Sequence, residues 1–83
     1  MAQIEKRYNR ALQIAEFLIE GGRVVQDVVE EFNISKDTYR KDMMLLATMG
    51  YGKEGERNKM LYIKAKTALN NEVSSRKKMK KRE

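Results

Sequence analysis

The 83-residue sequence contains no cysteine, histidine, proline or tryptophan. Without cysteine the chain has no disulfide and no thiolate nucleophile. Without histidine it lacks the commonest general acid–base group, and a zinc site would have to be built from carboxylates alone. Neither a GxxxxGK[ST] phosphate loop nor a GxSxG nucleophile elbow occurs in the sequence. We therefore expect a protein that is not an enzyme and that binds neither a metal ion nor another cofactor.

Long apolar runs are also missing. No stretch of about 18 apolar residues occurs, so we expect no segment that spans a membrane and no membrane partner. The first eight residues lack the apolar run of a signal peptide, which favours a cytoplasmic location. A chain of 83 residues is expected to form one domain with a modest core.

Charge is distributed unevenly along the chain, which carries a net charge of +6. Residues 76–83 contain six bases and one acid, and residues 36–66 contain eight bases and four acids. Residues 20–31, in contrast, contain four acids and one base. A small protein with one acidic and one basic face is suited to binding a polyanion on one side only.

The spacing of apolar residues predicts two helices in the first 32 residues. Residues 4–19 place apolar side chains three and four positions apart, and Gly21-Gly22 is expected to end this helix. Residues 24–32 have the same spacing, and their valines weaken the intrinsic helix preference, so burial must stabilise this second helix. The expected core residues are Ile4, Tyr8, Ala11, Leu12, Ala15, Leu18, Ile19, Val25, Val28, Val29 and Phe32.

A turn and a third helix follow. Asn33 tolerates a positive φ, Ser35 is a typical N-cap residue, and Asp37 lies in a first turn, where the helix dipole favours an acid. The third helix is expected over residues 36–49, with Tyr39, Met43 and Leu46 in the core.

Two structures fit residues 50–74. One is a single helix from about Glu56 to Ser74 that buries Leu61, Ala65, Ala68, Leu69 and Val73. The other is a short hairpin wing over residues 50–63 followed by a shorter helix. A wing needs an alternating apolar strand on each side of its turn, and the first side offers only Tyr51, so we prefer the helix.

The expected fold is therefore all-α: a three-helix core with a C-terminal helix, forming one domain over residues 1–75. The alternative is a winged helix with a hairpin at 50–63. Residues 76–83 have almost nothing to bury, and we expect them to form a flexible basic tail.

Residues 24–43 have the pattern of a helix-turn-helix. Val28, Phe32, Ile34 and Tyr39 fall where two steeply crossed helices must touch. The exposed edge of the second helix then carries short polar groups and long cations near its N-terminus. Such an edge can enter a major groove about 12 Å wide and donate to phosphates and base edges.

Several residues in this stretch agree in order and spacing with a known motif: Glu31-Phe32-Asn33-Ile34-Ser35-Lys36, then Thr38, then Arg40-Lys41-Asp42. On these residues the chain resembles the DeoR-type helix-turn-helix over about residues 10–46, and more closely the stage III sporulation protein D family of transcriptional regulators. The resemblance implies sequence-specific DNA binding, with repression or activation, and a second DNA contact from a basic C-terminal segment. Three residues depart from the usual motif, which has alanine at Val29, glycine at Asn33, and valine or isoleucine at Tyr39.

We expect DNA-binding residues in two groups. The helix group is Ser35, Lys36, Asp37, Thr38, Tyr39, Arg40 and Lys41, and the tail group is Arg76, Lys77, Lys78, Lys80, Lys81 and Arg82. Arg40 is the first candidate for a bidentate contact to guanine and Lys36 the second. Tyr39 is expected to keep its ring in the core and turn its hydroxyl to a phosphate, and Asp42 to pair with a base one turn away or to cap a neighbouring element.

The predicted function is regulation of transcription, with a reading helix at about residues 35–48 in the major groove and the tail on the DNA backbone. Candidate partners are double-stranded DNA and RNA polymerase, and we expect a monomer or a weak homodimer. Two alternatives stay open. One is a DNA-binding accessory protein of replication, partition or conjugation, and the other is a protein-interaction module of a phage or plasmid type.

Overall fold

The computed structural model describes the backbone of residues 2–81 and the side chains of residues 5–77. Four helices follow one another along the chain: α1 (Ala2–Ile19), α2 (Val25–Phe32), α3 (Lys36–Thr48) and α4 (Gly52–Lys81). No strand occurs in residues 2–81, so the all-α class is confirmed and the wing at 50–63 is wrong. Residues 52–63 form the beginning of α4 instead, because only one side of the supposed hairpin has a strand-like apolar run.

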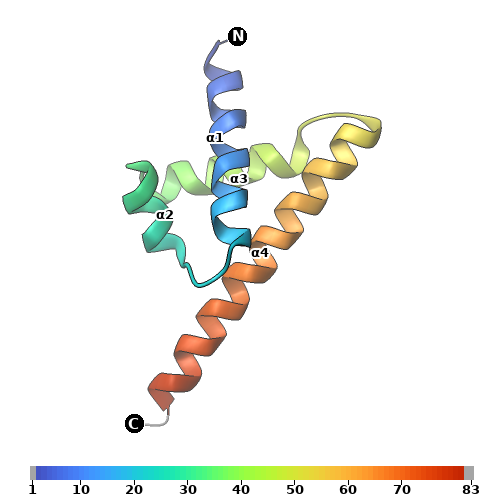
Figure 1. Cartoon of the computed structure of the whole chain (residues 1–83). Helices are drawn as coiled ribbons and strands as arrows, with labels where there is room; N and C mark the ends of the chain where they lie inside the picture. Colours follow the sequence, from blue (N-terminus) through green and yellow to red (C-terminus); the bar gives the residue numbers. More distant parts are fainter. Residues whose placement is uncertain (1, 82–83) are drawn as a thin grey trace.

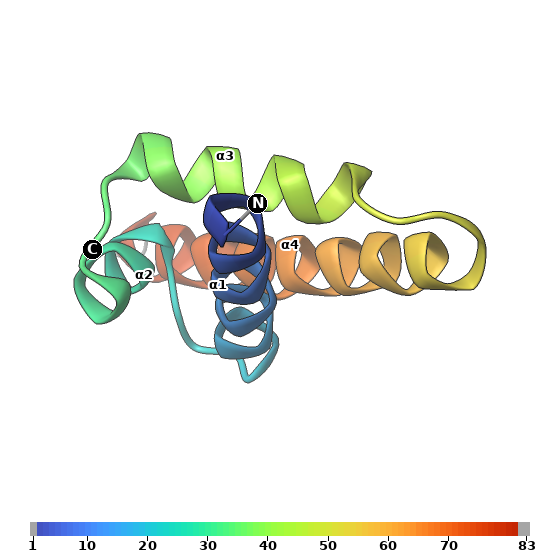
Figure 2. The same cartoon turned by 90° about the horizontal axis from the view of Figure 1, so that it is seen from above.

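The helices cross one another around α1. Figure 1 shows α1 passing steeply across α3, with α4 running diagonally beside both. Seen from above in Figure 2, α3 and α4 run in opposite directions, and α1 contacts both of them. The short α2 contacts α1 and α3, and the second half of α4 extends beyond the body of the protein. One broad side of α3 is therefore left uncovered.

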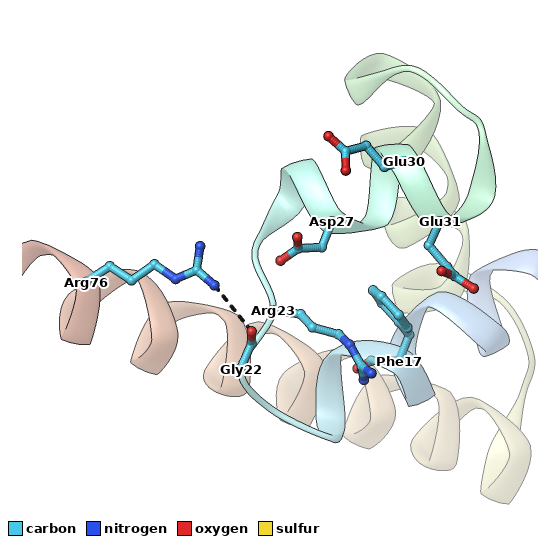
Figure 3. A pocket seen from close by; sticks show the side chains of 7 residues that line it. All are labelled: Phe17, Gly22, Arg23, Asp27, Glu30, Glu31 and Arg76. Carbon is cyan, nitrogen blue, oxygen red and sulfur yellow. Dashed lines mark hydrogen bonds between the residues drawn. The ribbon is translucent and has the colours of Figure 1, made fainter.

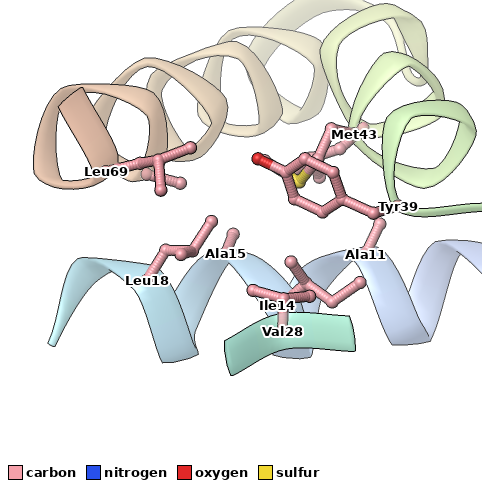
Figure 4. Close-up of a cluster of buried hydrophobic side chains, with 10 residues drawn as sticks. Ala11, Ile14, Ala15, Leu18, Val28, Tyr39, Met43 and Leu69 are labelled. Carbon is pink, nitrogen blue, oxygen red and sulfur yellow. The ribbon is translucent and has the colours of Figure 1, made fainter. Parts of the chain in front are cut away.

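The core lies where α1, α3 and α4 meet and is closed by α2 (Figure 4). It consists of Ala11, Ile14, Ala15, Leu18, Val28, Tyr39, Met43, Leu46, Ala65 and Leu69. The predicted stripe on α1 was too narrow, because Ile14 is fully buried although it was not expected in the core, while Ile19 is 37% exposed. A single apolar stripe corresponds to one buried face of the helix. Because α1 is contacted by three other helices, it buries a larger part of its circumference.

The beginning of α4 depends on a close approach between two glycines. A Cβ atom on Gly55 would lie 2.8 Å from the carbonyl oxygen of Gly50, so no larger residue fits at this position. One turn later the buried Asn58 accepts a hydrogen bond from the Tyr8 hydroxyl and donates one to the Met49 carbonyl, both at 3.0 Å. These contacts fix the first turns of α4 against α1 and the end of α3, so the helix starts at Gly52 rather than at Glu56.

At its other end α4 continues to Lys81 instead of stopping at Ser74. Residues 75–81 contain no glycine or proline, and most of them are arginine, lysine or methionine, which are good helix formers even without burial. The segment that we expected to be a flexible tail therefore begins as helix, and the predicted helix end at Ser74 was wrong. Arg82 lies outside the described residues.

Candidate nucleic-acid interface

The turn between α2 and α3 has the geometry that the sequence predicts. Asn33 adopts the left-handed conformation with φ +53°, which replaces the glycine usual in such turns. The Ile34 amide donates to the Val29 carbonyl at 3.1 Å, so the turn stays tight. Ser35 caps α3 by accepting a hydrogen bond from the Thr38 amide at 3.1 Å.

The exposed edge of α3 carries most of the predicted helix group. Ser35, Lys36, Asp37, Arg40 and Lys41 are all exposed, and Thr38 is half-buried. Lys36 and Arg40 are four residues apart and therefore share one side of the helix. Lys41 pairs instead with Asp37 at 3.2 Å, on a neighbouring side of the helix. Within the part of the chain that the structure describes, neither Lys36 nor Arg40 has an ion-pair partner.

Another face of α3 is held by an ion pair between the buried carboxylate of Asp42 and the partly exposed Arg10 of α1. Asp42 is completely buried, and it accepts hydrogen bonds from Nε of Arg10 and, at 3.1 Å, from Nη2 of Arg10. The hydrogen bond to Asp42 raises the pKa of the Arg10 guanidinium, although partial burial opposes the effect. Asp42 was expected to pair with a base one turn away or to cap a neighbouring element, so its partner on α1 is a correction. The pair sets the orientation of α3 relative to α1.

Tyr39 does not take the role that the sequence favoured. Its ring is in the core as expected, but its hydroxyl is enclosed and has no hydrogen-bond partner among the described residues. Figure 4 shows the hydroxyl directed inward, toward Leu69 of α4. The prediction that this hydroxyl reaches a phosphate is therefore wrong, because the packing of α3 against α4 covers it.

Replacing Tyr39 with phenylalanine is expected to raise the free energy of unfolding by about 1 kcal/mol, because it removes a buried polar group that has no partner. Burial raises the pKa of Tyr39, so the hydroxyl is neutral near pH 7 and must donate its proton or leave it unpaired. Thermal unfolding of the variant checks the sign of the change in stability. A loss of stability would show that the hydroxyl has a partner.

Two recesses flank α3, and cations but no carboxylates line both. The α1–α3 recess, of about 530 Å³, is lined by Lys6, Arg7, Arg10, Asn33, Ile34, Ser35 and Thr38. The α3–α4 recess, of about 220 Å³, is lined by Tyr39, Arg40, Met43, Met44, Tyr62 and Lys66. The bases that α1 and α4 bring to α3 were not among the predicted site residues. Lys6 and Arg10 are four residues apart, so their shared helix face was a usable signal.

The C-terminal bases are placed differently from the helix group. Nε of Arg76 donates to Oε2 of Glu72 at 2.6 Å, and this bond raises the pKa of Arg76. Nη2 of the same guanidinium donates to the Gly22 carbonyl at 3.3 Å. Arg76 thus connects α4 to the turn after α1, although its side chain is exposed, as is that of Lys77. The side chains of Lys78, Lys80 and Lys81 lie outside the described set, as does all of Arg82.

The acidic residues gather on α2. Asp27, Glu30 and Glu31 line a recess of about 470 Å³ together with Phe17, Gly22, Arg23 and Arg76 (Figure 3). The Asp27 carboxylate accepts a hydrogen bond from the Val24 amide at 2.8 Å and thereby caps α2. The exposed bases of α3 and the acids of α2 therefore belong to different helices, as the charge pattern indicated.

The described residues contain no group of three or more carboxylates that could hold a metal ion, and no helix among them is long and apolar enough to cross a membrane. No protein-family model, curated protein or solved structure matches the chain. The resemblance to the helix-turn-helix regulators therefore depends on the sequence of about residues 10–46 alone.

Proposed function

We propose that the protein binds double-stranded DNA sequence-specifically and regulates transcription, with α3 inserted in the major groove. The observation that carries the proposal is the pair Lys36 and Arg40, two exposed bases on one side of a helix whose other side is buried in the core. The 13 residues of α3 span about 20 Å, and the helix is narrow enough for a groove about 12 Å wide.

Specificity in this account comes from the first half of α3. Arg40 is the only arginine on this helix, and its planar guanidinium matches the O6 and N7 acceptors of guanine. Lys36 and Thr38 contact the backbone or a neighbouring base edge. Bases at the end of α4 add affinity that does not depend on sequence, because phosphate contacts act through charge and counterion release.

The test is selection of bound duplexes from a library with a random core, using the purified full-length chain. We expect enrichment of one motif that contains a fixed guanine, and binding of that motif near promoters in the source genome. Recovery of no motif would contradict sequence-specific binding. A motif that occurs at replication origins but not near promoters would contradict the role in transcription.

A further inference from the structure

The strongest unassigned feature of the molecule is the α1–α3 recess, whose walls contain three bases and no acid. Two recesses elsewhere carry both signs of charge. The one on α2 is lined by three carboxylates together with Arg23 and Arg76. One between α1 and α4 is lined by Glu16 and Glu54 together with Arg57. Within the described residues, Lys6 and Arg7 have no carboxylate within ion-pair distance. The recess therefore presents uncompensated positive charge directly beside the reading helix.

Donors in this recess are partly held in place before any ligand arrives. Arg10 is fixed by the buried Asp42, which accepts hydrogen bonds from only two of its nitrogens, while a guanidinium has five N–H groups. The side chain stays 33% exposed, so its remaining N–H groups have access to solvent. The Thr38 hydroxyl accepts a hydrogen bond from Ser35 at 3.0 Å, which leaves its own proton free to donate.

We propose that the α1–α3 recess binds a phosphodiester group, with Lys6 and Arg7 as its charged ligands. The inference rests on the proposed function, in which α3 enters a major groove. A helix with its side chains is about 10–12 Å across, so it fills a groove of about 12 Å and brings the flanks of α3 against the two strands. One flank is the α1–α3 recess, which then holds the backbone of one strand and fixes the depth and register of α3.

The first test measures duplex binding of Lys6→Ala/Arg7→Ala as a function of salt. Each lost phosphate contact reduces the slope of log K against log salt by about 0.9, so the slope should fall by about 1.8. At 0.15 M salt the same relation predicts about 30-fold weaker binding to every duplex, with the selected motif unchanged. The matched control is Lys53→Ala/Lys64→Ala, which removes two exposed bases of α4 that line none of these recesses. If the two double variants show the same slope, the recess is not a phosphate site.

A second test separates this inference from the proposed function. The free protein is titrated with inorganic phosphate while the amide resonances of Ser35 and Thr38 are followed. We expect saturable shifts in the wild type and none in Lys6→Ala/Arg7→Ala. Wild-type protein that selects no DNA motif but shows these shifts would contradict sequence-specific binding and support the recess. Equal shifts in both proteins would contradict phosphate binding in the α1–α3 recess and would not affect the proposal that the protein binds DNA.

Discussion

Replacing Arg10 with alanine is expected to lower the free energy of unfolding by roughly 2–3 kcal/mol, because it leaves the buried Asp42 carboxylate without its partner. The loss lies below the usual range for fully buried pairs, since Arg10 remains one-third exposed. In a domain of this size such a loss lowers the melting temperature by about 10–20 °C. Thermal and urea unfolding of the variant measure the effect directly.

A double variant shows whether the pair acts as a unit. Arg10→Met/Asp42→Leu replaces both charges with apolar groups, and it should recover most of the stability that Arg10→Ala loses. Arg7→Ala, which removes a base without an ion-pair partner among the described residues, should change the stability by less than about 0.5 kcal/mol. An Arg10→Ala variant as stable as Arg7→Ala would show that Asp42 is not held by this pair.

The second large effect is expected on DNA recognition. Arg40→Ala should weaken binding to the selected motif by about 5- to 150-fold, which corresponds to the 1–3 kcal/mol of a bidentate contact to guanine. Binding to unrelated duplexes should fall much less, because there Arg40 acts as one charge among many. Competition binding of wild type and variant to motif and unrelated duplexes gives the ratio of the two affinities.

Lys53→Ala is the control for this experiment, since Lys53 is exposed at the beginning of α4, at the opposite end of the molecule from the beginning of α3 (Figure 2). It should leave the ratio of specific to non-specific affinity unchanged. If the Arg40→Ala variant keeps the wild-type ratio and the same preferred motif, Arg40 does not contact a base.

The sequence predicted local features of the fold well. The left-handed Asn33, the Ser35 cap and the burial of Tyr39, Met43 and Leu46 depend on neighbours within one or two helical turns. Apolar spacing and capping chemistry report such short-range effects directly. The exposure of Lys36 and Arg40 follows from the same periodicity, because the buried residues of α3 lie on a different part of its circumference.

Features that depend on tertiary contacts were missed. Asp42 pairs with a base 32 positions away in the sequence. Ile14 is fully buried because α1 is contacted by three other helices, which no local pattern reveals. The prediction that the Tyr39 hydroxyl points outward was wrong for the same reason, since only the packing of α4 against α3 shows that the hydroxyl is covered. The helix α4 is longer than its apolar spacing predicts, because its last turns need no burial and are stabilised by residues of high helix propensity.

The most direct test of the central claim is a titration of isotopically labelled protein with the selected duplex, followed residue by residue through the amide resonances. We predict the largest shifts at residues 35–41, on the edge of α3 that carries Lys36 and Arg40, and small shifts on α2. Resonances at 35–41 that stay in place while those of another surface move would contradict insertion of α3 into the groove.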